Sequence, residues 1–181
     1  MVDWWLIVPD AVAVALCGVA AVIDLRHQRI PNWLTVPGFA AGLLVNAIAF
    51  TISFGFPQGL ASGLGYAIAG GGIALLIFFI LGAIGAFGMG DVKLMAAVGA
   101  LLGWPLILPT MVFVLIAGGL LSLGYALGRG TLRAVIRNIF RLAGSDREKL
   151  TLHRIPYGLA IFAGCLVAVL ARHLELSLPF G

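Results

Sequence analysis

Charged side chains are what this sequence has least of. Only 10% of its 181 residues are Asp, Glu, Lys or Arg, whereas 62% are hydrophobic. A soluble domain of ordinary composition carries about 25% charged residues, so the composition excludes that class. The net charge of +4 comes from few side chains that gather near the ends of apolar segments, and it gives no reason to expect a nucleic-acid partner. The sequence therefore predicts an all-α integral membrane protein.

Cysteine and histidine are also scarce, which bears on disulfides and on metal binding. The cysteines, Cys17 and Cys165, lie inside apolar segments and form no CxxC pair, so we interpret both as small buried hydrophobic residues. His27, His153 and His173 are scattered at segment ends beside arginines. We interpret these histidines as polar residues at the membrane interface, and we expect no metal site.

Long apolar runs, in contrast, fill most of the chain. A membrane-spanning helix needs about 20 mostly apolar residues. No basic region precedes the first run, so we expect a permanent helix there and not a cleaved signal peptide. The runs predict a single transmembrane domain over residues 1–181, with about six spans near 4–24, 33–52, 63–87, 91–104, 106–127 and 155–170.

Two features of these spans leave alternatives open. The span at 91–104 covers only about two-thirds of a typical hydrocarbon core, at about 1.5 Å rise per residue. Either Asp91 lies within the membrane boundary, which we favour, or this helix is partly re-entrant. The Gly-Gly-Gly run at 70–72 is either a face for close helix packing or a flexible point.

The segment 129–154 is the only strongly polar part of the chain. Arginines recur at every fourth position over 129–141 with apolar residues between them, a pattern typical of an amphipathic helix on an anionic leaflet. A substrate-binding role for this helix is the alternative. Positive loops lie in the cytoplasm, so this cluster, the arginines after the first span and Lys93 predict that both termini lie outside.

Acidic residues are the candidates for chemistry because an ionisable group at membrane depth is costly and usually functional. Two of the seven acids, Asp24 and Asp91, lie at the ends of apolar helices on the same predicted side of the membrane. Gly88 and Gly90 precede Asp91, and glycine lets another backbone approach closely. The other five belong to the chain ends, the predicted outer surface or the polar segment: Asp3, Asp10, Asp146, Glu148 and Glu175.

Two facing carboxylates cannot both ionise easily, so such a pair shares one proton near working pH. One carboxylate can then take a proton from water while the protonated one polarises a scissile carbonyl. The structural alternative is that Asp24 ends a helix in a surface ion pair with Arg26 and Arg29, while Asp91 only caps the fourth helix. Lys93 follows Asp91 by two residues, so we expect it to face elsewhere as an interfacial or substrate-facing charge.

Three motifs add a resemblance to these arguments. Asp24 is followed by Ile-Pro-Asn at 30–32, then by Gly-Met-Gly-Asp-Val-Lys-Leu at 88–94 and by Arg-Ile-Pro-Tyr-Gly at 154–158. Their content and order resemble the type IV prepilin peptidase family. The resemblance implies a membrane aspartic endopeptidase of the bacterial inner membrane that removes the basic leader of prepilins at the cytoplasmic face.

The resemblance also implies roles for particular residues. Asp24 and Asp91 correspond to the family's catalytic acids. The same match implies that seven residues bind substrate or support the site: Pro31, Asn32, Gly88, Gly90, Lys93, Pro156 and Gly158. The implied partner is a prepilin, a single hydrophobic helix with a basic leader, and no metal or cofactor is expected.

The sequence departs from the long members of that family in two places. Asp24 is followed almost at once by Ile30, which leaves no room for the cysteine-paired cytoplasmic region of those members. The chain therefore resembles the short branch that serves Flp or tight-adherence pili, and we expect no N-methyltransferase activity and no S-adenosylmethionine requirement. Leu159 stands where a second proline often follows Gly158, so the role of that element is a weaker expectation.

Two other classes compete with a peptidase. A proton-coupled transporter or channel would use Asp24 and Asp91 as a relay, since intramembrane acids also mark such paths. No inverted repeat is visible, however, and both acids fall on one side and not at the midplane. A membrane scaffold that recruits a partner through its arginine helix would tolerate replacement of both aspartates.

Overall fold

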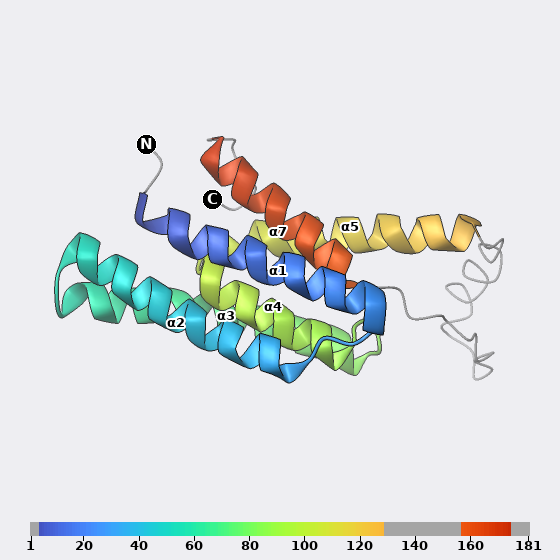
Figure 1. Ribbon diagram of the computed structural model, residues 1–181, viewed down its shortest axis with the longest axis horizontal. Coiled ribbons are helices and arrows are strands. Elements are labelled where there is room, and N and C mark those ends of the chain that lie inside the picture. The colour runs from blue at the N-terminus through green and yellow to red at the C-terminus, as the bar shows by residue number, and fades with distance from the viewer. Residues whose placement is uncertain (1–3, 129–156, 175–181) are drawn as a thin grey trace.

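The computed structural model describes residues 4–128 and 157–174, and every regular element in them is helical (Figure 1). A short 3-10 helix, η1, precedes six α-helices. Their bounds are η1 Trp4–Leu6, α1 Ile7–His27, α2 Asn32–Phe54, α3 Gln58–Ala83, α4 Met89–Leu102, α5 Ile107–Gly128 and α7 Tyr157–His173. The expected amphipathic helix at 129–141 and the rest of the segment 129–154 lie outside the described residues.

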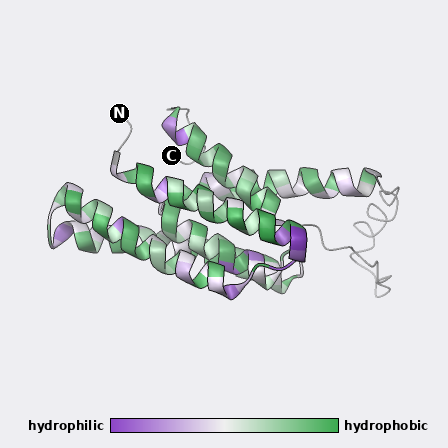
Figure 2. Ribbon diagram, in the orientation of Figure 1, coloured by the Kyte–Doolittle hydropathy of each residue, from purple (hydrophilic) through white to green (hydrophobic). Residues whose placement is uncertain are grey.

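Length and composition identify the helices that can cross a membrane. Four of the described helices qualify, α1, α2, α3 and α5, and α7 is a shorter apolar helix. Figure 2 shows that apolar residues occur on all sides of these helices and not on one face only. A helix that is apolar all round suits a lipid environment. The chain is thus an all-α, multi-pass membrane protein, as the sequence predicted.

Several helix boundaries differ from the expected ones, among them those of α1 and α3. The helix α1 continues three residues past Asp24, to His27, and ends where Gln28 adopts a left-handed conformation (φ 51°) and donates its N–H to the carbonyl of Asp24 at 2.8 Å. Charged residues can follow an apolar run in the same helix, so loss of hydropathy does not mark the helix end. The helix α3 begins at Gln58, just after Pro57, and ends at Ala83, each earlier than expected.

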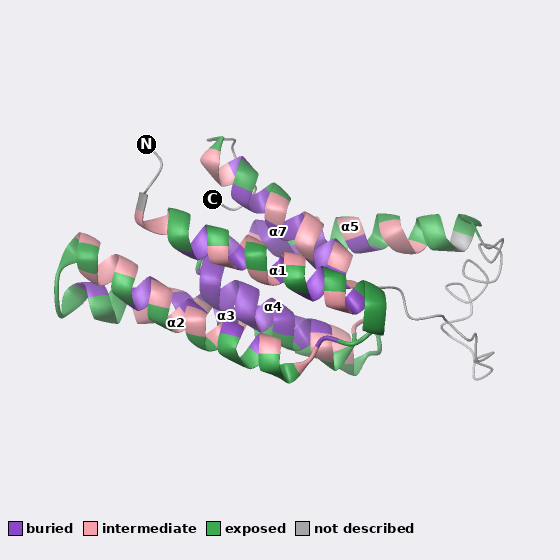
Figure 3. Ribbon diagram, in the orientation of Figure 1, coloured by how far each residue is buried: buried purple, intermediate pink, exposed green. Residues whose placement is uncertain are grey.

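The short helix α4 lies at the centre of the bundle (Figure 3). All its residues from Leu94 to Leu102 are buried, and it contacts α1, α2 and α3 as well as α5 and α7. Its 14 residues span about 21 Å, less than the thickness of a hydrocarbon core. Neighbouring helices surround α4, and a helix enclosed by protein need not match that thickness.

Close contact of α4 with α3 depends on glycine. A side-chain carbon at Gly70 would collide with the carbonyl oxygen of Gly99, and one at Gly99 would collide with that of Gly70. Gly72 faces open space, and α3 runs unbroken through the glycine run. The structure therefore favours the packing interpretation of residues 70–72 over a flexible point.

Side chains satisfy the last carbonyls of α4. The amide Nδ2 of Asn46 lies 2.9 Å from the oxygen of Ala100 and 3.0 Å from that of Leu101. The guanidinium of Arg172 donates to the oxygen of Leu102 at 3.3 Å. A helix end buried without partners is costly, so these contacts explain how α4 can end inside the bundle.

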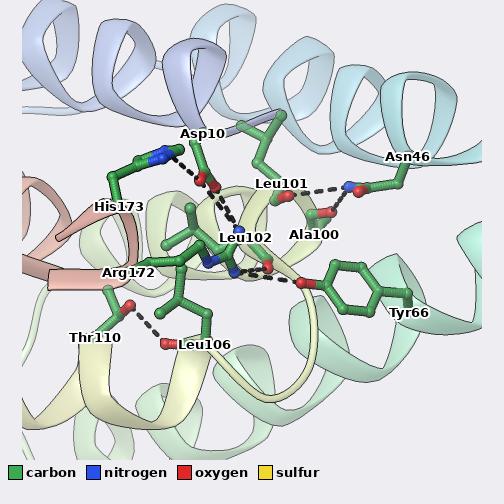
Figure 4. A network of polar contacts seen from close by, with 10 residues as sticks. All are labelled: Asp10, Asn46, Tyr66, Ala100, Leu101, Leu102, Leu106, Thr110, Arg172 and His173. Atoms are coloured by element: carbon green, nitrogen blue, oxygen red, sulfur yellow. Dashed lines mark hydrogen bonds and ion pairs between the residues drawn. The ribbon is translucent and has the colours of Figure 1, made fainter. Parts of the chain in front are cut away.

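Arg172 belongs to a polar network at this end of the molecule (Figure 4). Its Nη1 lies 2.9 Å from Oδ1 of Asp10 in α1, and Nε2 of His173 lies 3.1 Å from Oδ2 of the same carboxylate. A second guanidinium nitrogen donates to the hydroxyl of Tyr66 in α3 at 3.3 Å. Asp10 is only 1% exposed, because α7 covers it with Arg172 and His173.

Candidate active site

Asp24 lies in the last full turn of α1 and is 6% exposed. Its Oδ2 accepts a hydrogen bond of 2.8 Å from the backbone N–H of Gly158, at the start of α7. The N-terminal end of a helix favours a negative charge, so α7 presents both a donor and a favourable dipole to this carboxylate. A surface carboxylate paired only with Arg26 and Arg29 is not what the structure shows.

Gly158 can make this contact only because it lacks a side chain. A Cβ there would lie 2.9 Å from Cβ of Asp24, 3.1 Å from its Oδ2 and 3.3 Å from Cα of Ala21. Distances this short between a Cβ and its neighbours are rare in proteins, so any larger residue would push α7 away from α1.

Asp91 is the third residue of α4 and is 9% exposed. Its Oδ2 accepts the backbone N–H of Gly88, the residue before the helix, at 3.1 Å. This is the cap that the structural alternative proposed. A carboxylate has about four acceptor sites, so a cap hydrogen bond is compatible with a second role in proton transfer.

Two contacts join the start of α4 to the loop between α1 and α2. A Cβ on Gly90 would lie 3.2 Å from Cβ of Ile30 and 3.3 Å from its carbonyl oxygen, so the two backbones touch. The exposed Lys93 donates from Nζ to Oδ1 of Asn32 at 3.0 Å. Pro31, between them, is extended (φ −78°, ψ 149°) and directly precedes α2.

A third contact joins the start of α4 to the start of α7. The rings of Phe87 and Tyr157 have centroids 5.0 Å apart at an interplanar angle of 52°. Phe87 directly precedes Gly88, and Tyr157 directly precedes Gly158. The first two motifs and the described part of the third, Tyr157 and Gly158, therefore meet at one end of the bundle, where Asp24 and Asp91 are both held.

Most of the expected site residues fall in this cluster. It contains Asp24, Asp91, Pro31, Asn32, Gly88, Gly90, Lys93 and Gly158, whereas Pro156 lies outside the described residues. The sequence analysis missed Asn46 and Tyr157. A lone asparagine in an apolar span was a usable signal for the first, since polar groups there need partners. Tyr157 stands in the third motif, directly before Gly158, but the motif did not predict its contacts with distant residues.

Within residues 4–128 and 157–174, no group of three or more metal-ligating side chains converges. Two buried carboxylates at one end of a helical membrane bundle, each bound by a backbone N–H, define the class as a membrane protein with a candidate carboxylate site.

Comparison with known proteins identifies the family. Residues 11–123 match the type IV leader peptidase family, and the chain belongs to this family. The prepilin leader peptidase/N-methyltransferase of Myxococcus xanthus is 29% identical over 153 residues, which are 81% of this chain and 43% of that protein. The Burkholderia pseudomallei protein of the same name is 34% identical over 134 residues, 69% of this chain and 41% of its own length.

A third relative with this name, from Escherichia coli, is 33% identical over 110 residues, 59% of this chain and 44% of the relative. The chain thus spans about two-fifths of the length of the curated relatives it matches, from 41% to 44%. No solved structure matched the chain.

Proposed function

We propose that this protein is a membrane aspartic endopeptidase that cleaves the basic leader from prepilins at the cytoplasmic face. The observation that carries the proposal is the convergence of the three motifs around two buried carboxylates, Asp24 and Asp91. Membership of the type IV leader peptidase family supports it, and so do relatives that are named prepilin leader peptidases.

The proposed chemistry is general acid–base hydrolysis by the two carboxylates. The ionised member of the pair takes a proton from a water, and the water oxygen attacks the scissile carbonyl carbon. The protonated member donates to the carbonyl oxygen, and a proton then passes to the leaving amine as the C–N bond breaks. Two interacting carboxyl groups titrate as a pair, so neither Asp24 nor Asp91 is assigned as the acid or as the base.

Gly88 and Gly90 suit an extended substrate. Gly88 is exposed and lacks a side chain, so a peptide backbone can approach the cap hydrogen bond of Asp91 closely. Lys93 is exposed beside Asn32 and presents a positive charge next to the site. The apolar part of a prepilin would lie in the membrane beside the bundle, with its leader in the cytoplasm.

The proposal includes a location and a topology. The site lies at the end of the bundle that holds Arg26, Arg29 and Lys93, and positive residues favour the cytoplasm. We therefore place both termini outside a bacterial inner membrane and the site at its inner surface. The segment 129–141 would bind the anionic inner leaflet through its arginines.

The substrate branch is inferred from the first motif. Only a short loop separates Asp24 from α2, which begins at Asn32, so the cysteine-paired region of long members is absent between them. We propose a Flp-type prepilin as the substrate and an enzyme without N-methyltransferase activity that does not use S-adenosylmethionine. Addition of that cofactor to the reaction should leave the new N-terminus unmethylated.

The test is co-expression with small candidate prepilins, followed by mass spectrometry of the pilin N-terminus. Loss of a basic leader only when the protein is present would support the proposal. Intact leaders on every candidate, in membranes that contain folded protein, would contradict it.

One observation favours a second function. The buried Asp10 and the partly exposed His173 form a titratable pair at the end of the bundle opposite Asp24 and Asp91, as a proton path across the membrane would need. Proton flux in vesicles that contain this protein and no pilin would support a proton-coupled transporter. Against it, Arg172 already neutralises Asp10.

A further inference from the structure

Tyr157 lies where three elements meet. Its ring packs on Phe87 from the loop before α4, with centroids 5.0 Å apart. Its hydroxyl lies 3.2 Å from Oγ of Ser122 in α5, and that serine in turn donates to the carbonyl of Gly118 at 2.7 Å. Tyr157 itself is the first residue of α7. One side chain thus connects the starts of α4 and α7 to the middle of α5.

The residue that follows each of these two aromatic residues in the chain binds one of the two carboxylates. The residue after Phe87 is Gly88, whose N–H binds Oδ2 of Asp91 at 3.1 Å. The residue after Tyr157 is Gly158, whose N–H binds Oδ2 of Asp24 at 2.8 Å. The segment that binds Asp24 contains Tyr157, and the segment that binds Asp91 contains Phe87. The rings of these two aromatic residues are in contact. A change in the ring-to-ring contact would move the two amides, and with them the two carboxylates, relative to each other.

Both rings are backed by tightly packed atoms, so the contact has little freedom. A Cβ on Gly118 would lie 3.0 Å from Cε1 of Tyr157, so α5 presses directly on that ring. On the other side, the fully buried Phe78 lies behind Phe87 with centroids 4.8 Å apart. Packed interiors transmit small displacements because they contain few voids.

We propose that Tyr157 is a positioning residue that sets the separation of Asp24 and Asp91, and that Gly118 seats it for this purpose. The inference rests on the proposed peptidase function for its consequence in catalysis. A misplacement of about 1 Å in an active site can cost on the order of 100-fold in rate. In this role Tyr157 acts through the backbone of Gly158.

The test uses the full-length protein in membranes and pairs of variants. Tyr157→Leu and Gly118→Ala should each lower kcat for leader removal by about 10- to 100-fold with little change in KM. Tyr157→Phe keeps the ring on Phe87 and should restore kcat to within about threefold, since only the hydroxyl contact is lost. Gly119→Ala is the matched control for Gly118, because a Cβ at Gly119 meets nothing within 4 Å.

A second measurement reports the separation without any cleavage. In a chain with Cys17→Ala and Cys165→Ala, the exposed residues Leu25, next to Asp24, and Met89, two residues before Asp91, are both replaced by cysteine, so that both carboxylates stay in place. Thiol-reactive bifunctional reagents of graded length are then applied. We expect a narrow range of reagent lengths to cross-link the pair, and Tyr157→Leu or Gly118→Ala should widen or shift that range. Gly119→Ala should not change it.

The outcomes separate the two proposals. If the wild-type protein cleaves no candidate prepilin, the proposed function fails, while the cross-linking range still tests the positioning role. If the wild-type protein cleaves its pilin and Tyr157→Leu and Gly118→Ala leave both kcat and the cross-linking range unchanged, the positioning role is overturned. If Tyr157→Leu does not fold, the comparison of Gly118→Ala with Gly119→Ala decides the question.

Discussion

The backbone N–H of Gly158 donates to Oδ2 of Asp24 at 2.8 Å, although the two residues are 134 positions apart in the chain. The first turn of α7 thereby fixes a carboxylate of α1. Nothing larger than glycine fits at position 158, since a Cβ there would lie 2.9 Å from Cβ of Asp24. This contact joins the third sequence motif to the first, and it explains why a glycine is needed at position 158.

Gly158→Ala should therefore reduce leader cleavage by on the order of 100-fold, because the added methyl group displaces Asp24 from its donor. Rates are to be measured on purified protein in lipid vesicles, with an unprocessed prepilin that the wild-type protein cleaves as substrate. Gly72→Ala is the control, because a Cβ at Gly72 meets nothing within 4 Å. Equal rates for the wild type and Gly158→Ala would show that this contact has no catalytic role.

Gly90→Ala tests the contact between α4 and the loop at Ile30. The new Cβ would lie 3.2 Å from Cβ of Ile30 and 3.3 Å from its oxygen, so the loop must shift by a few tenths of an ångström. We expect a loss of about 10-fold in kcat/KM, smaller than for Gly158→Ala because a loop yields more easily than a helix. Gly65→Ala, at an open position, should behave as the wild type. An undiminished kcat/KM in Gly90→Ala would exclude the contact from the site.

Asn46→Leu tests how the central helix ends. The amide of Asn46 binds the carbonyl oxygens of Ala100 and Leu101, and both would lose this donor inside the bundle. Each unsatisfied buried group costs about 1–3 kcal/mol. Removal of Oδ1 of Asn46, which has no hydrogen-bond partner within the part of the chain that the structure describes, offsets part of that cost. We expect a net loss of about 2 kcal/mol in the free energy of unfolding, measured by denaturant titration in detergent micelles.

The control for Asn46 is Ser53→Ala, which removes a hydrogen bond within α2 only, from Oγ to the carbonyl of Ala49. Its free energy of unfolding should lie within about 0.5 kcal/mol of the wild type. If Asn46→Leu proves as stable as Ser53→Ala, the end of α4 does not depend on this amide.

Asp10 is buried and pairs with the partly buried Arg172, so the two residues should be strongly coupled. Arg172→Met leaves the carboxylate of Asp10 with His173 as its remaining ionic partner among the described residues, and it leaves the oxygen of Leu102 without its donor. Breaking such a pair on one side costs about 3–5 kcal/mol. Asp10→Asn combined with Arg172→Met should cost less than the sum of the two single changes. Additive losses in this double-mutant cycle would show that the pair is not coupled.

The sequence predicted the helical class and the common location of the motifs because both depend on local information. Apolar runs of about 20 residues identify spans, and positive charges near Asp24 and Asp91 put both acids on one side. The helix ends were less predictable, since α1 carries Leu25, Arg26 and His27 past its apolar run. A left-handed residue, Gln28, and not a change in hydropathy, ends that helix.

Contacts between distant segments could not be predicted from the sequence. The burial of Asp10 depends on α7 returning to α1 with Arg172 and His173, which lie more than 160 positions away. The role of Tyr157 depends on Gly118 and Phe87, which no periodicity links to it. These residues acquire partners only when α4, α5 and α7 pack, so their importance follows from tertiary structure.

The most direct test of the central claim replaces each acid separately with its neutral isostere. Asp24→Asn and Asp91→Asn, each co-expressed with a pilin that the wild-type protein processes, should leave the leader on the pilin, as read by mass spectrometry of its N-terminus. Asp146→Asn is the control for loss of one negative charge and should process the pilin normally. Full processing by either Asp24→Asn or Asp91→Asn, at wild-type protein levels, would contradict catalysis by this pair.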